Sequence, residues 1–233
     1  MSFMISWADA SKRSRSTDGG DSVKRFLSLC LTVFLLVSFT SAVFAEVRAP
    51  LRIARIPIIL QGWQVPDADT LAALETKLDR ALHIPLNDTL HAMEYLPEAE
   101  CMAALEQVMS DLRQRNRRVK LKDAMKPLAE VLRADIVVCP VLRDYWQYTG
   151  MSWNWNRGLI LHSAASVELA GYERATDRVF DKEYDKSYHS DYSSWGTADA
   201  LAGECMDHVI QEAGLHDMTA KWYRSLSRTE GKE

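Results

Sequence analysis

The pattern of apolar residues between Leu128 and Ser187 constrains the fold of this chain more than any other feature. The segment Ile136–Leu142 is continuously apolar, which is typical of a strand buried on both faces of a sheet. Apolar and polar residues then alternate along Leu159–Leu169 and again along Val179–Ser187, with a turn-like Ala175–Arg178 between them. These patterns predict a buried strand followed by a long β-hairpin that places one face on a core.

The rest of the chain switches between strand-like and helix-like segments. Leu51–Leu60 is rich in β-branched residues and predicts a buried strand, and a short strand is expected around Leu90–Tyr95. Apolar spacing predicts five helices: one capped by Asp67 or Asp69 and reaching about residue 82, one opened by Pro97, one over Leu121–Ala134, one capped by Thr197 and ended by Gly214, and a short one with Met218, Trp222 and Leu226. We therefore expect an α/β fold with α and β elements mixed: a mixed four- to five-stranded sheet, helices mainly on one face and a long β-hairpin.

Residues 1–45 have the pattern of an export signal. Lys24 and Arg25 precede an uncharged apolar run, Phe26–Phe44, and small residues flank the expected cleavage point after Ala45. This arrangement predicts a signal peptide and a periplasmic or secreted protein. The run is just long enough to cross a bilayer, so an uncleaved N-terminal anchor is the alternative, and only in that case is a membrane a partner.

The remainder of the chain is long enough for one domain with a substantial core, which we expect over residues 46–228, with residues 229–233 as a frayed tail. The formal net charge of the whole chain is −4, and the leader is itself basic, so the mature part is more acidic still. Binding to phosphate backbones requires a basic surface, and we therefore expect no nucleic-acid partner.

Three cysteines follow the leader: Cys101, Cys139 and Cys205. Cys139 lies in an apolar strand and is expected to be a small buried hydrophobic residue. If the exported protein carries one disulfide, it joins Cys101 to Cys205, and the alternative is that all three thiols remain free.

The segment Leu128–Asp135 ends a helix in Leu-Arg-Ala-Asp and leads directly into the apolar strand, the alternating strand Ala165–Gly171 and a turn at Ala175–Asp177. This order resembles the extracytoplasmic α/β domain shared by the curli assembly channel protein, the lipoprotein activators of peptidoglycan synthases and the N-terminal domain of translocation protein TolB. The chain departs from that pattern where Arg133-Ala134 replaces Gly-Ala, and it lacks a lipobox. The resemblance implies a non-enzymatic interaction domain outside the cytoplasm.

The segment Tyr145–Arg157 holds three tryptophans and two tyrosines in thirteen residues. We expect an aromatic loop here, because exposed Trp and Tyr stack on sugars or anchor protein partners. The candidate binding residues are Tyr145, Trp146, Tyr148, Trp153, Asn154, Trp155 and Arg157. The alternative is that the tryptophans fold back as a lid over the edge of the sheet.

The chain carries no recognisable catalytic or metal motif, and we expect no catalytic residue, metal or cofactor. The segment Ser187–Asp191 contains Ser, His and Asp, but neighbours along one segment seldom converge into a triad. The carboxylates Asp177, Asp181, Glu183 and Asp185 alternate with basic residues, which favours charge pairing on a solvated face. Glu204, His208 and Glu212 share one helix face and are expected to form an exposed charged stripe.

These expectations combine into an exported binding or scaffold protein of the cell envelope without catalytic activity, which acts through the aromatic loop and the hairpin. Its partner is an envelope protein or a glycan. The first alternative is an exported hydrolase that acts on cell-wall glycan with hairpin carboxylates or the Ser/His/Asp segment. A further alternative is a homo-oligomer formed through the edge of the hairpin.

Overall fold

The computed structural model describes residues 50–230 of the 233-residue chain, apart from residues 85–86, 88–91, 117 and 152–157. The chain divides into two units, Met1–Arg48 and Ala49–Glu233, and the description that follows concerns the second. The expected signal peptide lies outside the described residues, as does most of the expected tail. No helix in the described part of the chain is long and apolar enough to cross a bilayer.

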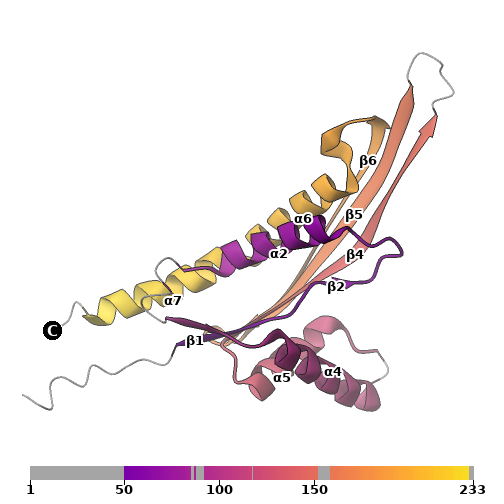
Figure 1. Ribbon diagram of the computed structural model, residues 1–233. Helices are drawn as coiled ribbons and strands as arrows, with labels where there is room; N and C mark the ends of the chain where they lie inside the picture. Colours follow the sequence, from indigo (N-terminus) through magenta and orange to yellow (C-terminus); the bar gives the residue numbers. More distant parts are fainter. Residues whose placement is uncertain (1–49, 85–86, 88–91, 117, 152–157, 231–233) are drawn as a thin grey trace, which may run out of the picture. The chain divides into compact units, whose positions relative to one another are not determined.

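Six strands form one mixed sheet in the order β3-β1-β4-β5-β6, and β2 pairs with β4 beyond the end of β1 (Figure 1). Pairing is parallel between β1 and β3, β1 and β4, and β2 and β4, and antiparallel from β4 to β5 and from β5 to β6. The strands are β1 Leu51–Arg55, β2 Ile59–Leu60, β3 Met93–Tyr95, β4 Ile136–Met151, β5 Leu159–Glu173 and β6 Arg178–Asp191. The expected α/β class, mixed sheet and long hairpin are confirmed, with six strands instead of four or five.

The expected aromatic loop is wrong for residues 145–151, because β4 continues through them to Met151. A bulge between Leu142 and Asp144 shifts the register, after which β4 pairs with β5 as far as Met151 and Leu159. Aromatic residues and threonine fit a pleated surface well, so Tyr145–Thr149 extends the strand. Gln147, between Trp146 and Tyr148, follows from the alternation along this strand.

The described residues form five helices, and the bounds of the first four follow the apolar spacing closely, whereas the last has 16 residues and is not the short helix expected. They are α2 Ala68–Leu82, α4 Glu98–Arg115, α5 Leu121–Leu132, α6 Ala198–Ala213 and α7 Leu215–Glu230. The side chain of Asp67 accepts a 2.7 Å hydrogen bond from the backbone N–H of Thr70 and so caps α2. The side chain of Thr197 caps α6, which ends at Gly214 in the left-handed conformation (φ 73°).

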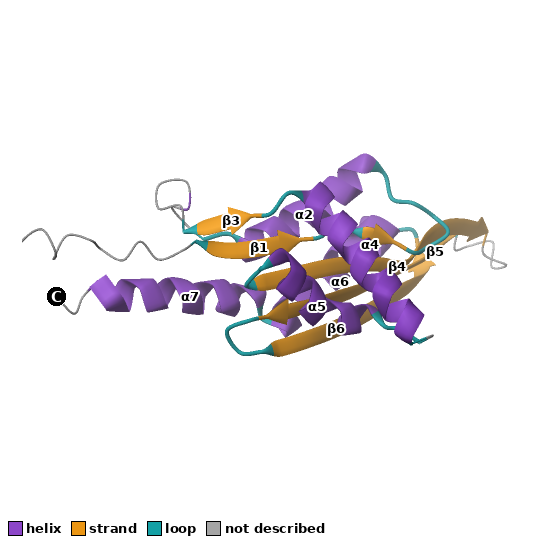
Figure 2. Cartoon of the chain, turned by 90° about the horizontal axis from the view of Figure 1, so that it is seen from below, coloured by secondary structure: helices purple, strands orange, loops and turns teal. Residues whose placement is uncertain are grey.

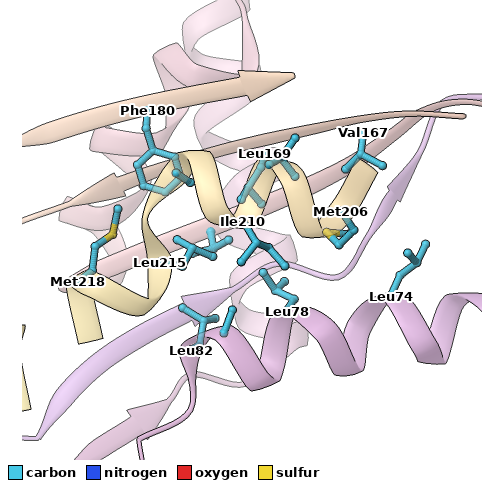
Figure 3. Close-up of a cluster of buried hydrophobic side chains, with 14 of the residues drawn as sticks. Leu74, Leu78, Leu82, Val167, Leu169, Phe180, Met206, Ile210, Leu215 and Met218 are labelled. Atoms are coloured by element: carbon cyan, nitrogen blue, oxygen red, sulfur yellow. The ribbon is translucent and has the colours of Figure 1, made fainter. Parts of the chain in front are cut away.

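Helices cover both faces of the sheet, which corrects the expectation of one main face. Helices α2, α6 and α7 lie on one face, and α4 and α5 lie on the other (Figures 1 and 2). The first face buries a core that includes Leu78, Leu169 and Met206 (Figure 3). The second face buries another core that includes Met125 and Leu128 of α5.

The one disulfide considered from the sequence, between Cys101 and Cys205, is contradicted by this arrangement, and the alternative of three free thiols is confirmed. Cys101 lies in the core under α4, whereas Cys205 lies in the core under α6, on the opposite face of the sheet. A disulfide requires Cα atoms within about 7 Å of each other, which a β-sheet between them does not permit. Cys101, Cys139 and Cys205 are all free and buried.

A candidate binding site on the open face of the sheet

The α4/α5 side of the sheet has an uncovered part, which we call the open face. In Figures 1 and 2, β4 and β5 run well past α4 and α5. The core under those helices includes Val141 on β4 and Ala170 on β5. Among the described residues, no member of this core follows Val141 on β4 or precedes Ala170 on β5. Alternate residues beyond this point share the same side of β4, β5 and β6, and no helix of the described residues lies above them.

Four rings on the open face form a continuous stack across three strands, which we call the ring stack. The ring centroids of Trp146 and Tyr148 are 5.7 Å apart with their planes at 20°. Tyr148 stacks on His162 at 4.6 Å and 7°, and His162 meets His189 edge-on at 4.1 Å and 63°. The Nδ1 atoms of the two histidines lie 2.7 Å apart, within hydrogen-bond distance.

Strand register brings these four rings together. Trp146 and Tyr148 are two residues apart on β4 and therefore point to the same side. Tyr148 is paired with His162 on β5, and His162 is paired with His189 on β6. Side chains opposite each other in an antiparallel pair lie within contact distance, so the stack follows from pairing alone.

Stacking covers the faces that Trp146, Tyr148 and His162 turn toward one another, so the edges of these rings are the parts left to solvent. Tyr148 is 55% exposed, His189 is exposed, and Trp146 and His162 are half-buried. The phenol, indole and imidazole groups offer hydrogen-bond donors and acceptors to a ligand. A flat platform for sugar rings is not formed along the row, since a sugar would need a free ring face.

Charged side chains lie next to the ring stack, toward α5. Arg143 contacts Glu168 at 3.4 Å and Glu183 at 2.8 Å, and Lys122 of α5 contacts Asp181 at 3.4 Å. Burial raises the pKa of Glu168, and the nearby negative charge of Asp181 raises it further, whereas Arg143 lowers it. Asp181 and Glu183 are therefore engaged in ion pairs as expected, but their partners come from α5 and β4 and not from the basic residues that alternate with them.

An ion pair and a hydrogen bond to Asp177 hold the turn between β5 and β6. Lys126 of α5 donates to both carboxylate oxygens of Asp177, at 2.7 and 3.0 Å, and the hydroxyl of Tyr172 donates to the same carboxylate at 2.8 Å. These hydrogen bonds, that from Lys126 first, lower the pKa of Asp177. Asp177 itself adopts a left-handed conformation (φ 49°), which suits an aspartate in a tight turn.

Tyr145 belongs to the opposite side of β4 and not to the ring stack. Its ring packs against the core under α6, and its hydroxyl donates to the carboxylate of Asp199. Burial, followed by the hydrogen bond to Asp199, raises the pKa of Tyr145. We therefore regard Tyr145 as a residue that holds β4 against α6.

The structure thus divides the candidate residues of the aromatic segment. Trp146 and Tyr148 lie together on the open face, and Tyr145 faces α6. The other candidates, Trp153, Asn154, Trp155 and Arg157, lie outside the described residues. His162 and His189 were not expected in the site, because only the pairing of β5 with β6 brings them to it.

The two other constellations suggested by the sequence do not form active sites. Ser187, His189 and Asp191 lie along an extended strand, and the Nδ1 of His189 contacts His162 and not the aspartate. On α6, Glu204 pairs with Lys186, Glu212 pairs with Lys182 at 2.7 Å, and His208 stacks on Tyr184 at 3.9 Å. The charged stripe of α6 therefore lies along β6, and the hydrogen bond from Lys182 lowers the pKa of Glu212.

A groove with a volume of about 720 Å³ lies between β2 and α4. It is lined by apolar residues, among them Met102, Leu105 and Met109, together with Glu106 and Arg113. None of its lining residues belongs to the ring stack or to the paired carboxylates of the hairpin. Within the described ranges, no group of three or more His, Cys, Asp or Glu residues is arranged to hold a metal ion.

Comparison with known proteins finds similarity in solved structures alone. No family model matches the chain, and no curated protein matches it. Lipoprotein GNA1162 from Neisseria meningitidis is 15% identical, with 71% of this chain and 99% of that one covered and a TM-score of 0.33. The PelC dodecamer from Paraburkholderia phytofirmans is 12% identical, with 73% and 88% covered and a TM-score of 0.35.

The C-terminal domain of LpoB from Salmonella enterica is 10% identical, with 59% of this chain and 83% of that one covered and a TM-score of 0.29. A lipoprotein is thus among the similar structures, in partial agreement with the resemblance read from the sequence. Scores this low establish no family and carry no information about what the chain binds.

Proposed function

We propose that this protein is an exported, non-catalytic binding protein of the cell envelope that holds its partner on the open face. The ring stack carries the proposal: Trp146, Tyr148, His162 and His189 lie in one row on a strand surface without a helix above it. Aromatic side chains bring a large contact area to an interface at a low cost in conformational entropy. The export signal expected in residues 1–45 supports the location.

The partner class that fits the ring stack best is an extended segment of an envelope protein. Outward-facing ring edges can exchange hydrogen bonds with a peptide backbone and pack against alternate side chains. A glycan partner would instead use the outer face of Trp146, which stands at one end of the row and, among the described residues, has a neighbouring ring on one side only. Both partners come from the same compartment, so one experiment can compare them.

A double variant tests the proposal. Trp146→Ala with Tyr148→Ala should abolish the crosslinking of the full chain to envelope proteins in membrane fractions. Trp63→Ala with Trp195→Ala is the matched control, because those tryptophans are 76% and 84% exposed and lie outside the ring stack. Circular dichroism of both variants checks that the fold is intact.

The outcomes are distinct. Loss of crosslinked protein in the Trp146/Tyr148 variant alone supports the proposal. If the unaltered chain forms no protein crosslink but co-sediments with peptidoglycan sacculi, and the Trp146/Tyr148 variant does not co-sediment, the partner is a glycan and not a protein. Equal behaviour of both double variants and the unaltered chain would refute a role for the ring stack.

One observation favours the hydrolase as a second candidate. A glycosidase uses one carboxyl group of raised pKa beside a second carboxylate, and Glu168 with Asp181 has this relationship. The nearby Arg143 and Lys122 pair with these groups and weigh against it. The test is the release of soluble fragments from purified sacculi. Release by the unaltered chain and the Trp146/Tyr148 variant, but not by Glu168→Gln, would establish hydrolase activity.

A further inference from the structure

The contact between His162 and His189 has a chemical property that the rest of the ring stack lacks. The two imidazoles face each other through the same ring atom, with Nδ1 atoms 2.7 Å apart. In this contact one Nδ1 carries the proton and the other presents its lone pair. When that proton moves through solvent to the Nε2 of the same ring, both Nδ1 atoms present lone pairs in the contact, and imidazole is the commonest metal ligand in proteins.

We propose that His162 and His189 form a binding site for one divalent transition-metal ion, Cu²⁺ or Ni²⁺, which takes the place of the shared proton. This site depends on the geometry of the pair and is independent of the proposed binding function. It gives a use to two residues that no sequence motif singles out, since they lie 27 positions apart in the chain.

The distance between the two nitrogens is closer to the spacing of neighbouring ligands in square-planar coordination than to their spacing in tetrahedral coordination. A metal–imidazole bond is about 2.0–2.1 Å long, so two such bonds at a right angle place their nitrogens about 2.9 Å apart, and at a tetrahedral angle about 3.3 Å apart. The observed 2.7 Å is within about 0.2 Å of the first value, but about 0.6 Å short of the second. Square-planar or tetragonal coordination is the preference of Cu²⁺ and Ni²⁺, whereas Zn²⁺ prefers the tetrahedron.

The pair is held in place before any ion arrives. Stacking on Tyr148, at 4.6 Å and 7°, restrains the ring of His162. His189 is placed by direct pairing with His162 in the antiparallel ladder. Ligands that are already oriented lose less conformational entropy on binding, which compensates in part for the small number of ligands.

The surroundings of the pair suit a cation. His162 is half-buried and His189 is exposed, so an ion can reach both from solvent. Asp185 and Asp191 lie on the same side of β6 as His189, because they are separated from it by even numbers of residues. Their negative charge raises the local concentration of cations.

The remaining coordination positions of the ion are open. Among the described residues, no third His, Cys, Asp or Glu completes a group of three. Water fills those positions in the isolated protein, and a donor group of a bound partner can replace it. We therefore expect exchangeable binding of moderate affinity instead of a closed structural site.

Titration with CuCl₂ tests the proposal, with the full chain produced without a polyhistidine tag. Calorimetry should show one Cu²⁺ ion per chain, and electron paramagnetic resonance should show coupling to two imidazole nitrogens. His162→Ala and His189→Ala should each weaken Cu²⁺ binding at least tenfold. His208→Ala is the matched control, because His208 lies on α6 and stacks on Tyr184, away from the pair.

Titrations with NiCl₂ and ZnCl₂ test the choice of metal, and binding of Zn²⁺ as tight as that of Cu²⁺ would overturn it. Unchanged Cu²⁺ affinity in both His162→Ala and His189→Ala would overturn the site itself, as would an equal loss in His208→Ala. If an alanine variant unfolds, His162→Gln and His189→Gln keep the size and polarity of the side chain and give the same test.

Discussion

The side-chain oxygen of Gln64 accepts a 2.8 Å hydrogen bond from the backbone N–H of Gln147 on β4. Gln64 follows β2, which pairs with β4 only at Val141 and Leu142. The side chain of Gln64 therefore gives a backbone N–H of β4 a hydrogen-bond partner beyond the end of β2. The side chain of Gln147 accepts in turn from the backbone N–H of Ala198 at 2.8 Å, at the start of α6. The two glutamines thus tie the strand that carries Trp146 and Tyr148 to the elements on either side.

We predict that Gln64→Ala weakens this part of β4. Loss of one partly buried hydrogen bond should cost about 1 kcal/mol, and the amide of Gln147 should exchange with solvent faster. Hydrogen exchange followed by mass spectrometry measures both effects. Gln61→Ala is the control, because Gln61 contributes its backbone N–H, and not its side chain, to Leu142. Equal protection of β4 in the two variants would contradict the prediction.

Gly171→Ala should be strongly destabilising. An added Cβ would approach the backbone oxygen of Val137 to 2.5 Å and would also overlap the ring of Phe180. Overpacking of this kind costs about 1–3 kcal/mol, and a backbone oxygen in a central strand cannot easily move. Chemical denaturation gives the free energy of unfolding.

The matched control for Gly171 is Gly203→Ala on α6. Its added Cβ would lie 3.6 Å from the Cε of Lys77, which is an ordinary contact. Alanine favours a helix over glycine by about 1 kcal/mol, so this variant should be more stable than the unaltered chain. Destabilisation of similar size in both variants would show that crowding at Gly171 is not the cause.

Glu168→Gln should stabilise the protein at neutral pH. Because burial raises the pKa of Glu168 in the folded chain, the folded state binds this proton more tightly than the unfolded state does. The contribution of Glu168 to stability is therefore most favourable at acidic pH and is lost as pH rises through its folded pKa. Removal of the ionisation should raise stability at pH 7–8 by up to about 1 kcal/mol, and the gain should shrink toward pH 4.

Thermal unfolding across this pH range provides the measurement. Glu183→Gln serves for comparison, since it removes the other carboxylate that contacts Arg143. A gain for Glu168→Gln that is the same at pH 4 and pH 8, or that also occurs in Glu183→Gln, would argue against a buried carboxyl as its source.

The three buried cysteines should remain reduced and unreactive in the folded protein. Burial raises the pKa of Cys139 to about 12 and that of Cys205 to about 11, and only a thiolate reacts readily with iodoacetamide. Mass spectrometry should find no modification of Cys101, Cys139 or Cys205 in the native state and modification of all three after denaturation. Protection of two of them until a reductant is added would reveal a disulfide.

The candidate site could be predicted from the sequence only in part. The cluster of aromatic residues after Leu142 predicted Trp146 and Tyr148 as candidate binding residues, because a dense group of rings attracts attention whatever its secondary structure. It did not show that Tyr145 faces α6, since that depends on the bulge between Leu142 and Asp144. Nor could it reveal the partners of Tyr148, because His162 and His189 reach it only through the register of two further strands.

The sequence by itself determined the features that depend on neighbouring residues. The caps at Asp67 and Thr197, the end of α6 at Gly214 and the alternation along the hairpin are local, and each follows from side-chain chemistry or a repeat of 2 or 3.6 residues. Tertiary structure alone decided which faces the helices cover, that Cys101 and Cys205 are separated by the sheet, and that two histidines meet at 2.7 Å. The physical reason is that strand order and register are set by the burial of the two cores together, which no single segment encodes.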